Sequence, residues 1–189
     1  MKRGPLLTAL REATATEHRA VEALMPPAWD TIDRQTYARH LATLAGFHVP
    51  LEDRLYATHD WAALGLPEAG ARRRAELLDN DLRALGVDPD GVRRCRDLPD
   101  VALEARALGT LYVLEGSALG GQILARQVRQ ALGDGAPSAF FDAGGADVSA
   151  RWRSFCGFAE SRAARGSDAI APAVDAAVET FRALRRWLG

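Results

Sequence analysis

Apolar residues recur every three or four positions along most of this chain, and this spacing restricts its fold more than any other feature. No stretch shows the alternation of β-branched and aromatic residues that is typical of strands. In a first predicted helix, from about Leu6 to Met25, one face carries Leu7, Leu10, Thr14, His18, Val21 and Met25. The pattern predicts an all-α multi-helix bundle, in which any site lies between facing helices.

Prolines and glycines divide the chain into six to eight predicted helices. Pro26 and Pro27 should end the first helix, and a second should begin near Asp33, with a kink or restart at Pro50. Further helices are expected over residues 71–86, about 99–132, 148–163 and 172–188, with a glycine-rich loop at 133–147. Since no internal repeat is visible, we expect a single domain over residues 1–189.

The composition is that of a globular protein, because 48% of the 189 residues are hydrophobic and 26% are charged. A formal net charge of −1 gives no sign of nucleic acid or an anionic membrane as a partner. The first 19 residues carry charge within the apolar segment that a secretory signal would need, so we expect a cytoplasmic protein. Cys95 and Cys156 show no CxxC pattern and are expected to be buried free thiols.

The segment YVLEGSALGGQILAR, residues 112–126, is helical in its spacing but holds Gly116, Gly120 and Gly121. Each glycine inside a helix costs about 1 kcal/mol relative to alanine. Three interpretations are open at this point. The glycines can form a turn between two helices, allow a close helix crossing through Gly116 and Gly120, or let the backbone approach a ligand.

His18 lies on the apolar face of the first predicted helix, where Glu17 and Arg19 are expected to face water. A lone histidine in such a position is either a core residue or a ligand. Glu22 lies one turn later and can accept a hydrogen bond from the ring, which would fix the tautomer and raise the basicity of the other nitrogen. A neutral imidazole held in this way is typical of a proximal haem ligand.

Two motifs together resemble the haem oxygenase family, particularly its bacterial, biliverdin-producing branch. They are LREATATEHRAVE at residues 10–22 and YVLEGSALGGQI at residues 112–123. FFDAGG at 140–145, the segment 152–155 and the closing TFRALRRWL also resemble that branch, so the likeness covers nearly the whole chain. The resemblance implies a haem held between a proximal helix, residues 6–25, and a kinked distal helix, about residues 100–132.

The resemblance also implies roles for individual residues. His18 matches the iron ligand, and Glu22 matches the carboxylate that hydrogen-bonds to it. Gly116, Gly120 and Gly121 match the distal glycines, which let the helix backbone pass over the face of the haem. In this family haem is both cofactor and substrate: O₂ and electrons from a separate reductase or ferredoxin convert it to biliverdin, CO and ferrous iron.

The sequence departs from the family pattern at Ser117. Many members carry an aspartate there that anchors a water network for proton delivery, and a serine hydroxyl is shorter and carries no charge. Proton delivery, and with it turnover, therefore depends on other groups. For the haem propionates, Arg11, Tyr112 and Arg126 are candidate partners.

Three other functions remain open for an all-α chain of this kind. A haem-binding or storage protein would hold haem without opening the ring. A di-iron oxidase would need four to six inward-facing carboxylates and histidines, yet no paired Glu-x-x-His spacing occurs. A thiamin-degrading enzyme would need a cysteine nucleophile, and neither Cys95 nor Cys156 has a context that favours one.

Overall fold

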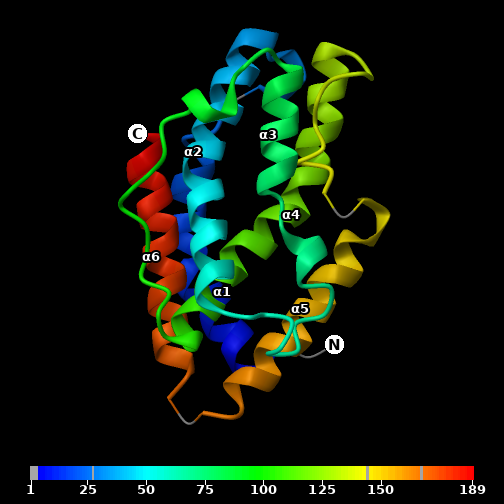
Figure 1. Cartoon of the computed structure of the whole chain (residues 1–189). Helices are drawn as coiled ribbons and strands as arrows, with labels where there is room; N and C mark the ends of the chain where they lie inside the picture. The colour runs from blue at the N-terminus through cyan, green and yellow to red at the C-terminus, as the bar shows by residue number, and fades with distance from the viewer. Residues whose placement is uncertain (1–3, 27, 144, 167) are drawn as a thin grey trace.

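The structure, a computed structural model, describes residues 4–26, 28–143, 145–166 and 168–189. Within these residues it is built of helices without a strand, which confirms the predicted all-α class (Figure 1). The α-helices are α1 (Pro5–Glu22), α2 (Arg34–Thr58), α3 (Ala75–Ala84), α4 (Glu104–Leu132), α5 (Val148–Ala163) and α6 (Ile170–Leu188). Short 3₁₀ helices cover Trp29–Thr31, Gly70–Arg72, Pro89–Gly91 and Gly145–Asp147. None of the described helices is long and apolar enough to cross a membrane.

Most helix boundaries follow local signals in the sequence. Asp33 caps α2 by accepting a 2.8 Å hydrogen bond from the backbone N–H of Thr36. Gly86, just beyond α3, has φ +84°, a conformation that favours glycine. The prediction for the first helix was too long, because α1 ends at Glu22, before the prolines; Pro27 itself lies outside the described residues. The predicted restart at Pro50 was wrong, since α2 continues through it.

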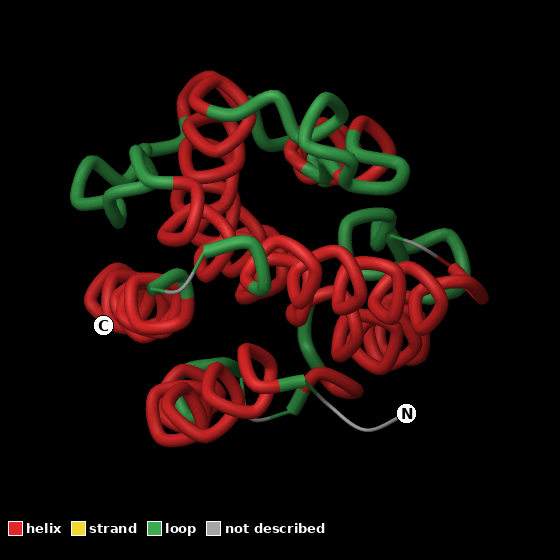
Figure 2. The backbone as a smooth tube through the Cα atoms, turned by 90° about the horizontal axis from the view of Figure 1, so that it is seen from below, coloured by secondary structure: helices red, strands yellow, loops and turns green. Residues whose placement is uncertain are grey.

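α6 packs against both α1 and α4, and these contacts organise the bundle (Figures 1 and 2). The α4–α6 crossing is close because Gly109 has no side chain. A Cβ atom at that position would collide with the backbone of Ala173. A glycine does therefore allow a close helix crossing in α4, but it lies before the three glycines to which the sequence pointed.

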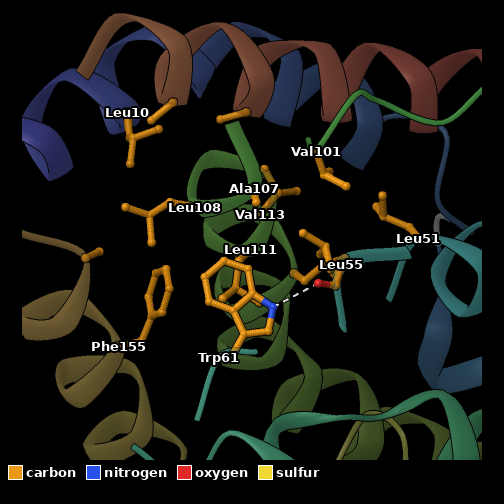
Figure 3. Close-up of a cluster of buried hydrophobic side chains, with 14 of the residues drawn as sticks. Leu10, Leu51, Leu55, Trp61, Val101, Ala107, Leu108, Leu111, Val113 and Phe155 are labelled. Carbon is orange, nitrogen blue, oxygen red and sulfur yellow. Dashed lines mark hydrogen bonds between the residues drawn. The ribbon is translucent and has the colours of Figure 1, made fainter. Parts of the chain in front are cut away.

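One buried hydrophobic cluster joins α1, α4, α5 and α6 to the end of α2. Figure 3 shows Trp61 at its centre, close to Leu111 and Phe155. The Trp61 indole N–H donates a 3.1 Å hydrogen bond to the carbonyl oxygen of Leu55, so this large side chain is buried without an unpaired polar atom. A second cluster lies between α2, α3 and the loop before α5. Together they support the helices that surround the site.

The unfolding free energy should fall as the pH is lowered from about 6.5 to about 4, because of His40. Its Nε2 atom is buried without a hydrogen-bond partner, and burial lowers the pKa of His40 to about 4. In this range the unfolded chain binds a proton that the folded chain does not, which costs the native state up to roughly 3 kcal/mol. Urea unfolding at several pH values, compared with His40→Phe, measures the effect. An unchanged pH slope in the variant would assign it to another group, such as the buried His48.

Candidate functional site

A cleft of about 830 Å³ lies between α1, α4 and α5. This volume is within the range of about 300–1,000 Å³ that is usual for small-molecule sites. α1 supplies Arg11, Thr14, Ala15, His18 and Arg19; α4 supplies Tyr112 and Leu119; α5 supplies Trp152, Arg153, Cys156, Gly157 and Glu160. His18 of α1 and Tyr112 and Leu119 of α4 thus line one slot, rather than lying on opposite sides of the molecule. Gly116, Gly120 and Gly121 are not among the residues that line it.

His18 stands on the α1 wall with its side chain 55% exposed, so it is not the interior residue that the apolar stripe predicted. Glu17, expected to face water, is the buried neighbour, at 8% exposure. The reason lies in α6, where the guanidinium groups of Arg182 and Arg185 contact the Glu17 carboxylate at 2.8 and 3.0 Å. The apolar spacing of α1 gave no sign of these partners from the far end of the chain.

Two groups flank the His18 imidazole. Nδ1 lies 3.4 Å from the Glu22 carboxylate, slightly beyond the usual hydrogen-bond distance. On the other side, the Phe181 ring meets the imidazole edge-on, with the centroids 5.4 Å apart. With Nδ1 facing a carboxylate, Nε2 is the nitrogen left to bind a ligand.

The N-terminus of α1 is tied to the opposite wall of the cleft. The Glu160 carboxylate of α5 accepts hydrogen bonds from the backbone N–H groups of Leu6 and Leu7, at 3.4 and 2.9 Å. A carboxylate at this end of a helix pairs its free N–H groups and favours its dipole. This contact fixes α1 relative to α5 at one end of the slot.

The three glycines that the sequence singled out have different surroundings. A Cβ atom at Gly116 would lie 3.8 Å from the Trp152 ring, in ordinary contact, and one at Gly120 would meet no atom within 4 Å. A Cβ atom at Gly121 would collide with the carbonyl of Phe141, so this glycine faces the loop before α5. Because α4 is one continuous helix through all three, the turn interpretation was wrong.

The side chain of Ser117 has two partners. Its hydroxyl lies 2.7 Å from the Leu114 carbonyl oxygen, to which it donates, and it accepts a 2.7 Å hydrogen bond from Nη2 of Arg74. The same Arg74 nitrogen also donates to the Leu114 carbonyl at 2.7 Å. The hydroxyl proton of Ser117 is therefore committed to the backbone, and one oxygen lone pair remains for a water molecule.

Arg74 belongs to a buried group of charges behind α4. Arg72 is 3% and Arg74 is 5% exposed, and Arg72 pairs with Glu115, the residue before Gly116. The guanidinium of Arg74 also lies 4.8 Å from the centre of the Phe140 ring. In the sequence these arginines belong to a run of three, ARRRAE, which is typical of a solvated surface, so no local signal indicated their burial.

Glu52 of α2 completes this group. Its carboxylate accepts hydrogen bonds from the backbone N–H groups of Arg74 and Ala75, at 2.7 and 2.9 Å, and contacts His48 at 3.1 Å. Burial by itself raises the pKa of Glu52, but the hydrogen bond and charge of His48, with the two N–H groups, lower it overall. The carboxylate therefore stays ionised and anchors the start of α3.

Of the predicted propionate partners, the structure brings Arg11 and Tyr112 to the cleft but not Arg126. Arg126 is exposed further along α4 and donates to the carbonyl of Gln122, 3.3 Å away. Arg19 and Arg153 line the cleft as well, although the sequence did not point to them. The mouth of the slot is therefore basic.

The described residues contain no cluster of three or more His, Cys, Asp or Glu side chains arranged to hold a metal ion. A di-iron site therefore has no support in this part of the chain. Both cysteines are buried and neither forms a disulfide, as predicted. Cys156 lines the cleft, whereas burial raises the pKa of the Cys95 thiol, so it gains no nucleophilic character.

Comparison with known proteins gives a consistent result. The family model described as "Heme oxygenase" matches residues 4–189. A protein of Xanthomonas campestris pv. campestris (strain 8004) named "Heme oxygenase" is 36% identical over 151 residues, which cover 75% of this chain and 84% of that protein.

Two solved structures share the fold at low identity. The haem oxygenase of Leptospira interrogans has a TM-score of 0.75 at 20% identity and covers 98% of both chains. That of Neisseria meningitidis, solved with NO and CO bound, has a TM-score of 0.75 at 21% identity and covers 96% of this chain and 91% of its own.

Proposed function

Because the chain belongs to the haem oxygenase family and is an enzyme that degrades haem, we propose that the cleft between α1, α4 and α5 is where haem binds and is cleaved. One observation carries this assignment. A single cleft of about 830 Å³ has an accessible imidazole, that of His18, on the α1 wall, and Tyr112 and Leu119, about one turn either side of Gly116, on the α4 wall.

The residues of the cleft fit haem. Gly120 leaves open the space that a Cβ atom would fill, and at Gly116 only the rim of Trp152 is in reach, so the α4 backbone can approach a flat ligand closely. Leu7, Leu119 and Trp152 provide apolar contact. Such a pocket, apolar with a few polar groups at defined positions, is typical of cofactor sites.

We assign the axial ligand to His18 through Nε2. Glu22 would hold the proton on Nδ1, and Phe181 limits rotation of the ring. A neutral imidazole with a partner on its second nitrogen is the usual proximal arrangement for haem. The propionates would extend to the basic mouth, where Arg11, Arg19 and Arg153 supply cations and Tyr112 supplies a hydroxyl.

Bound haem would supply the O₂ and electron chemistry that yields biliverdin, CO and ferrous iron. The protein's own contribution on the α4 side is to shape the space and to position water. Ser117 can accept a hydrogen bond from a water molecule but cannot donate one, since its own proton is held by the Leu114 carbonyl. Arg74 keeps the hydroxyl in this orientation.

The family implies a reductase as the source of electrons. We propose that this partner is a reductase or a ferredoxin and that the enzyme works in the cytoplasm, where such carriers and free haem meet.

Haem titration followed by reduction tests the function. We expect a Soret band to appear at one haem per chain and then to be replaced by biliverdin absorbance when ascorbate is added in air. A chelator should trap the released iron. A Soret band that persists through repeated reduction would contradict turnover, and titration without a Soret band would contradict the haem site.

Ser117→Ala should lower both stability and turnover. The variant removes one acceptor from the buried guanidinium of Arg74, which costs about 1–3 kcal/mol. Ser117→Asp is the matched variant, because it restores the acceptor that alanine lacks and adds a negative charge beside Arg74. We expect it to turn over faster than Ser117→Ala. Urea unfolding and the initial rate of biliverdin formation measure the two effects. Equal rates in all three proteins would show that this side chain has no part in proton delivery.

A further inference from the structure

Six arginines gather where the C-terminal half of α6 meets the segment 93–97. We call this surface the α6 basic face; it consists of Arg93, Arg94, Arg96, Arg182, Arg185 and Arg186. The carboxylates that pair with these arginines are Asp79, Asp97 and Glu17. Asp88 also lies beside Arg93 and Arg186, in the adjoining hollow. Six cations against four anions leave an excess of two positive charges on this face, although the whole chain has a formal net charge of −1. The rest of the molecule is therefore negative, and the asymmetry favours an acidic partner here.

The face is hollowed and has an apolar floor. A surface hollow of about 790 Å³ is lined by arginines around Cys95, Ala183 and Trp187. Both Arg93 and Arg96 are exposed beside it. An apolar centre with a charged rim is the usual anatomy of a protein–protein interface.

The segment 93–97 is held in place before any partner arrives. The backbone N–H of Cys95 donates a 2.8 Å hydrogen bond to the carbonyl of Gly46, and the indole N–H of Trp187 donates one of 2.8 Å to that of Thr43. The Arg93 guanidinium stacks 4.4 Å from the centre of the Trp187 ring. A Cβ atom at Gly46 would collide with the Arg93 carbonyl and the Trp187 ring. The segment therefore packs closely against α2 because position 46 is a glycine. A preformed surface loses little conformational entropy on binding.

The face also adjoins the helix that carries the proposed axial ligand. Arg182 and Arg185 bind Glu17, the residue before His18. On the same turn of α6, the ring of Phe181 packs edge-on against the His18 imidazole. A partner bound to this face would thus lie against the α6 side of the proximal helix.

We propose that the α6 basic face docks the electron donor, an acidic one-electron carrier protein of the ferredoxin or flavodoxin type. The inference rests on the proposed function, since only a haem in the cleft needs these electrons. Each encounter transfers one electron: the redox centre of the donor is oxidised by one electron, and the haem receives it.

The test reverses charge at three arginines of the face that do not line the cleft. In Arg93→Glu/Arg96→Glu/Arg186→Glu, the KM for reduced ferredoxin, or for flavodoxin, should rise at least tenfold at low salt. The kcat with ascorbate should stay unchanged, because ascorbate needs no docking site. Calorimetry of the haem-free protein with ferredoxin should show a matching loss of affinity. In the wild type, added salt should raise the same KM.

The matched control is Arg34→Glu/Arg83→Glu/Arg165→Glu, which makes the same charge change at exposed residues away from the hollow. Its KM should stay within twofold of the wild type. An unchanged KM in the first variant, an equal rise in the control, or failure of both carriers to bind the wild type would overturn the proposal. The proposal would also be overturned if the face bound phosphatidylglycerol vesicles while the kinetics with ferredoxin were the same in the charge-reversal variant as in the wild type. If ascorbate gives no biliverdin with the wild type, it is the proposed function that fails instead.

Discussion

The His18→Ala protein is expected to bind haem weakly and to form no measurable biliverdin. Substitution of outer-shell partners typically costs about 10–100-fold in metal affinity or activity, and loss of the ligand itself should cost more. The fold should be retained, because the side chain is 55% exposed and its removal leaves no buried cavity. Absorbance at the Soret band and the rate of biliverdin formation with ascorbate measure the two losses.

Added imidazole provides the control for this variant. It should enter the space left by the missing side chain, restore the Soret band and return part of the turnover. Glu22→Gln should show a smaller defect, since it weakens the partner of Nδ1 and leaves the ligand in place. Biliverdin formation by His18→Ala at the wild-type rate, without imidazole, would refute the ligand assignment.

Two neighbouring glycines of α4 should respond in opposite ways to alanine. Gly121→Ala should lower the unfolding free energy by about 1–3 kcal/mol, because its Cβ would collide with the backbone of Phe141, which cannot move aside as a flexible side chain would. Gly120→Ala should raise it by about 0.5–1 kcal/mol, because the added methyl meets open space and alanine favours the helix. Thermal and urea unfolding measure both changes.

The affinity for haem should also distinguish variants at Gly120 from variants at Gly121. Gly120→Leu should fold normally but bind haem poorly, because the larger side chain projects from the exposed α4 backbone into the space proposed for the ligand. Gly121→Ala should retain its affinity for haem at temperatures where it is folded. If Gly120→Leu turned over haem like the wild type, the open space at Gly120 would have no role in binding.

The class of the fold and most helix boundaries followed from the sequence, and the resemblance to the haem oxygenase family indicated that α1 and α4 meet at one cleft. The spacing of Leu7, Leu10 and Thr14 indicates burial on one face of a helix. The pairing of α1 with α4 was implied only by the family resemblance of the two motifs. Where a helix ends depends on weaker, local effects. α1 ends at Glu22 rather than Met25, although the prolines that follow gave the right region.

The features that the sequence did not predict depend on contacts between segments far apart in the chain. Periodicity placed His18 inside and Glu17 outside, whereas arginines of α6, more than 160 residues later, bury Glu17. The arginine run at 72–74 is polar by composition, yet Arg72 and Arg74 are buried because Glu115 and the α4 backbone supply partners. A pattern within one helix carries no information about such partners.

The contacts that hold α1 impose an order on the assembly of the site. Both ends of this first helix depend on segments near the C-terminus. The backbone N–H of Leu7 donates a hydrogen bond to Glu160, 153 positions later, and the Glu17 carboxylate accepts one from Arg182, 165 positions later. A ribosome-bound chain that lacks α5 and α6 contains His18, but Glu160 and Arg182, which hold α1 in place, are not yet present. Contacts this distant in sequence form late in folding. The nascent protein should therefore be unable to capture haem until its synthesis is almost finished.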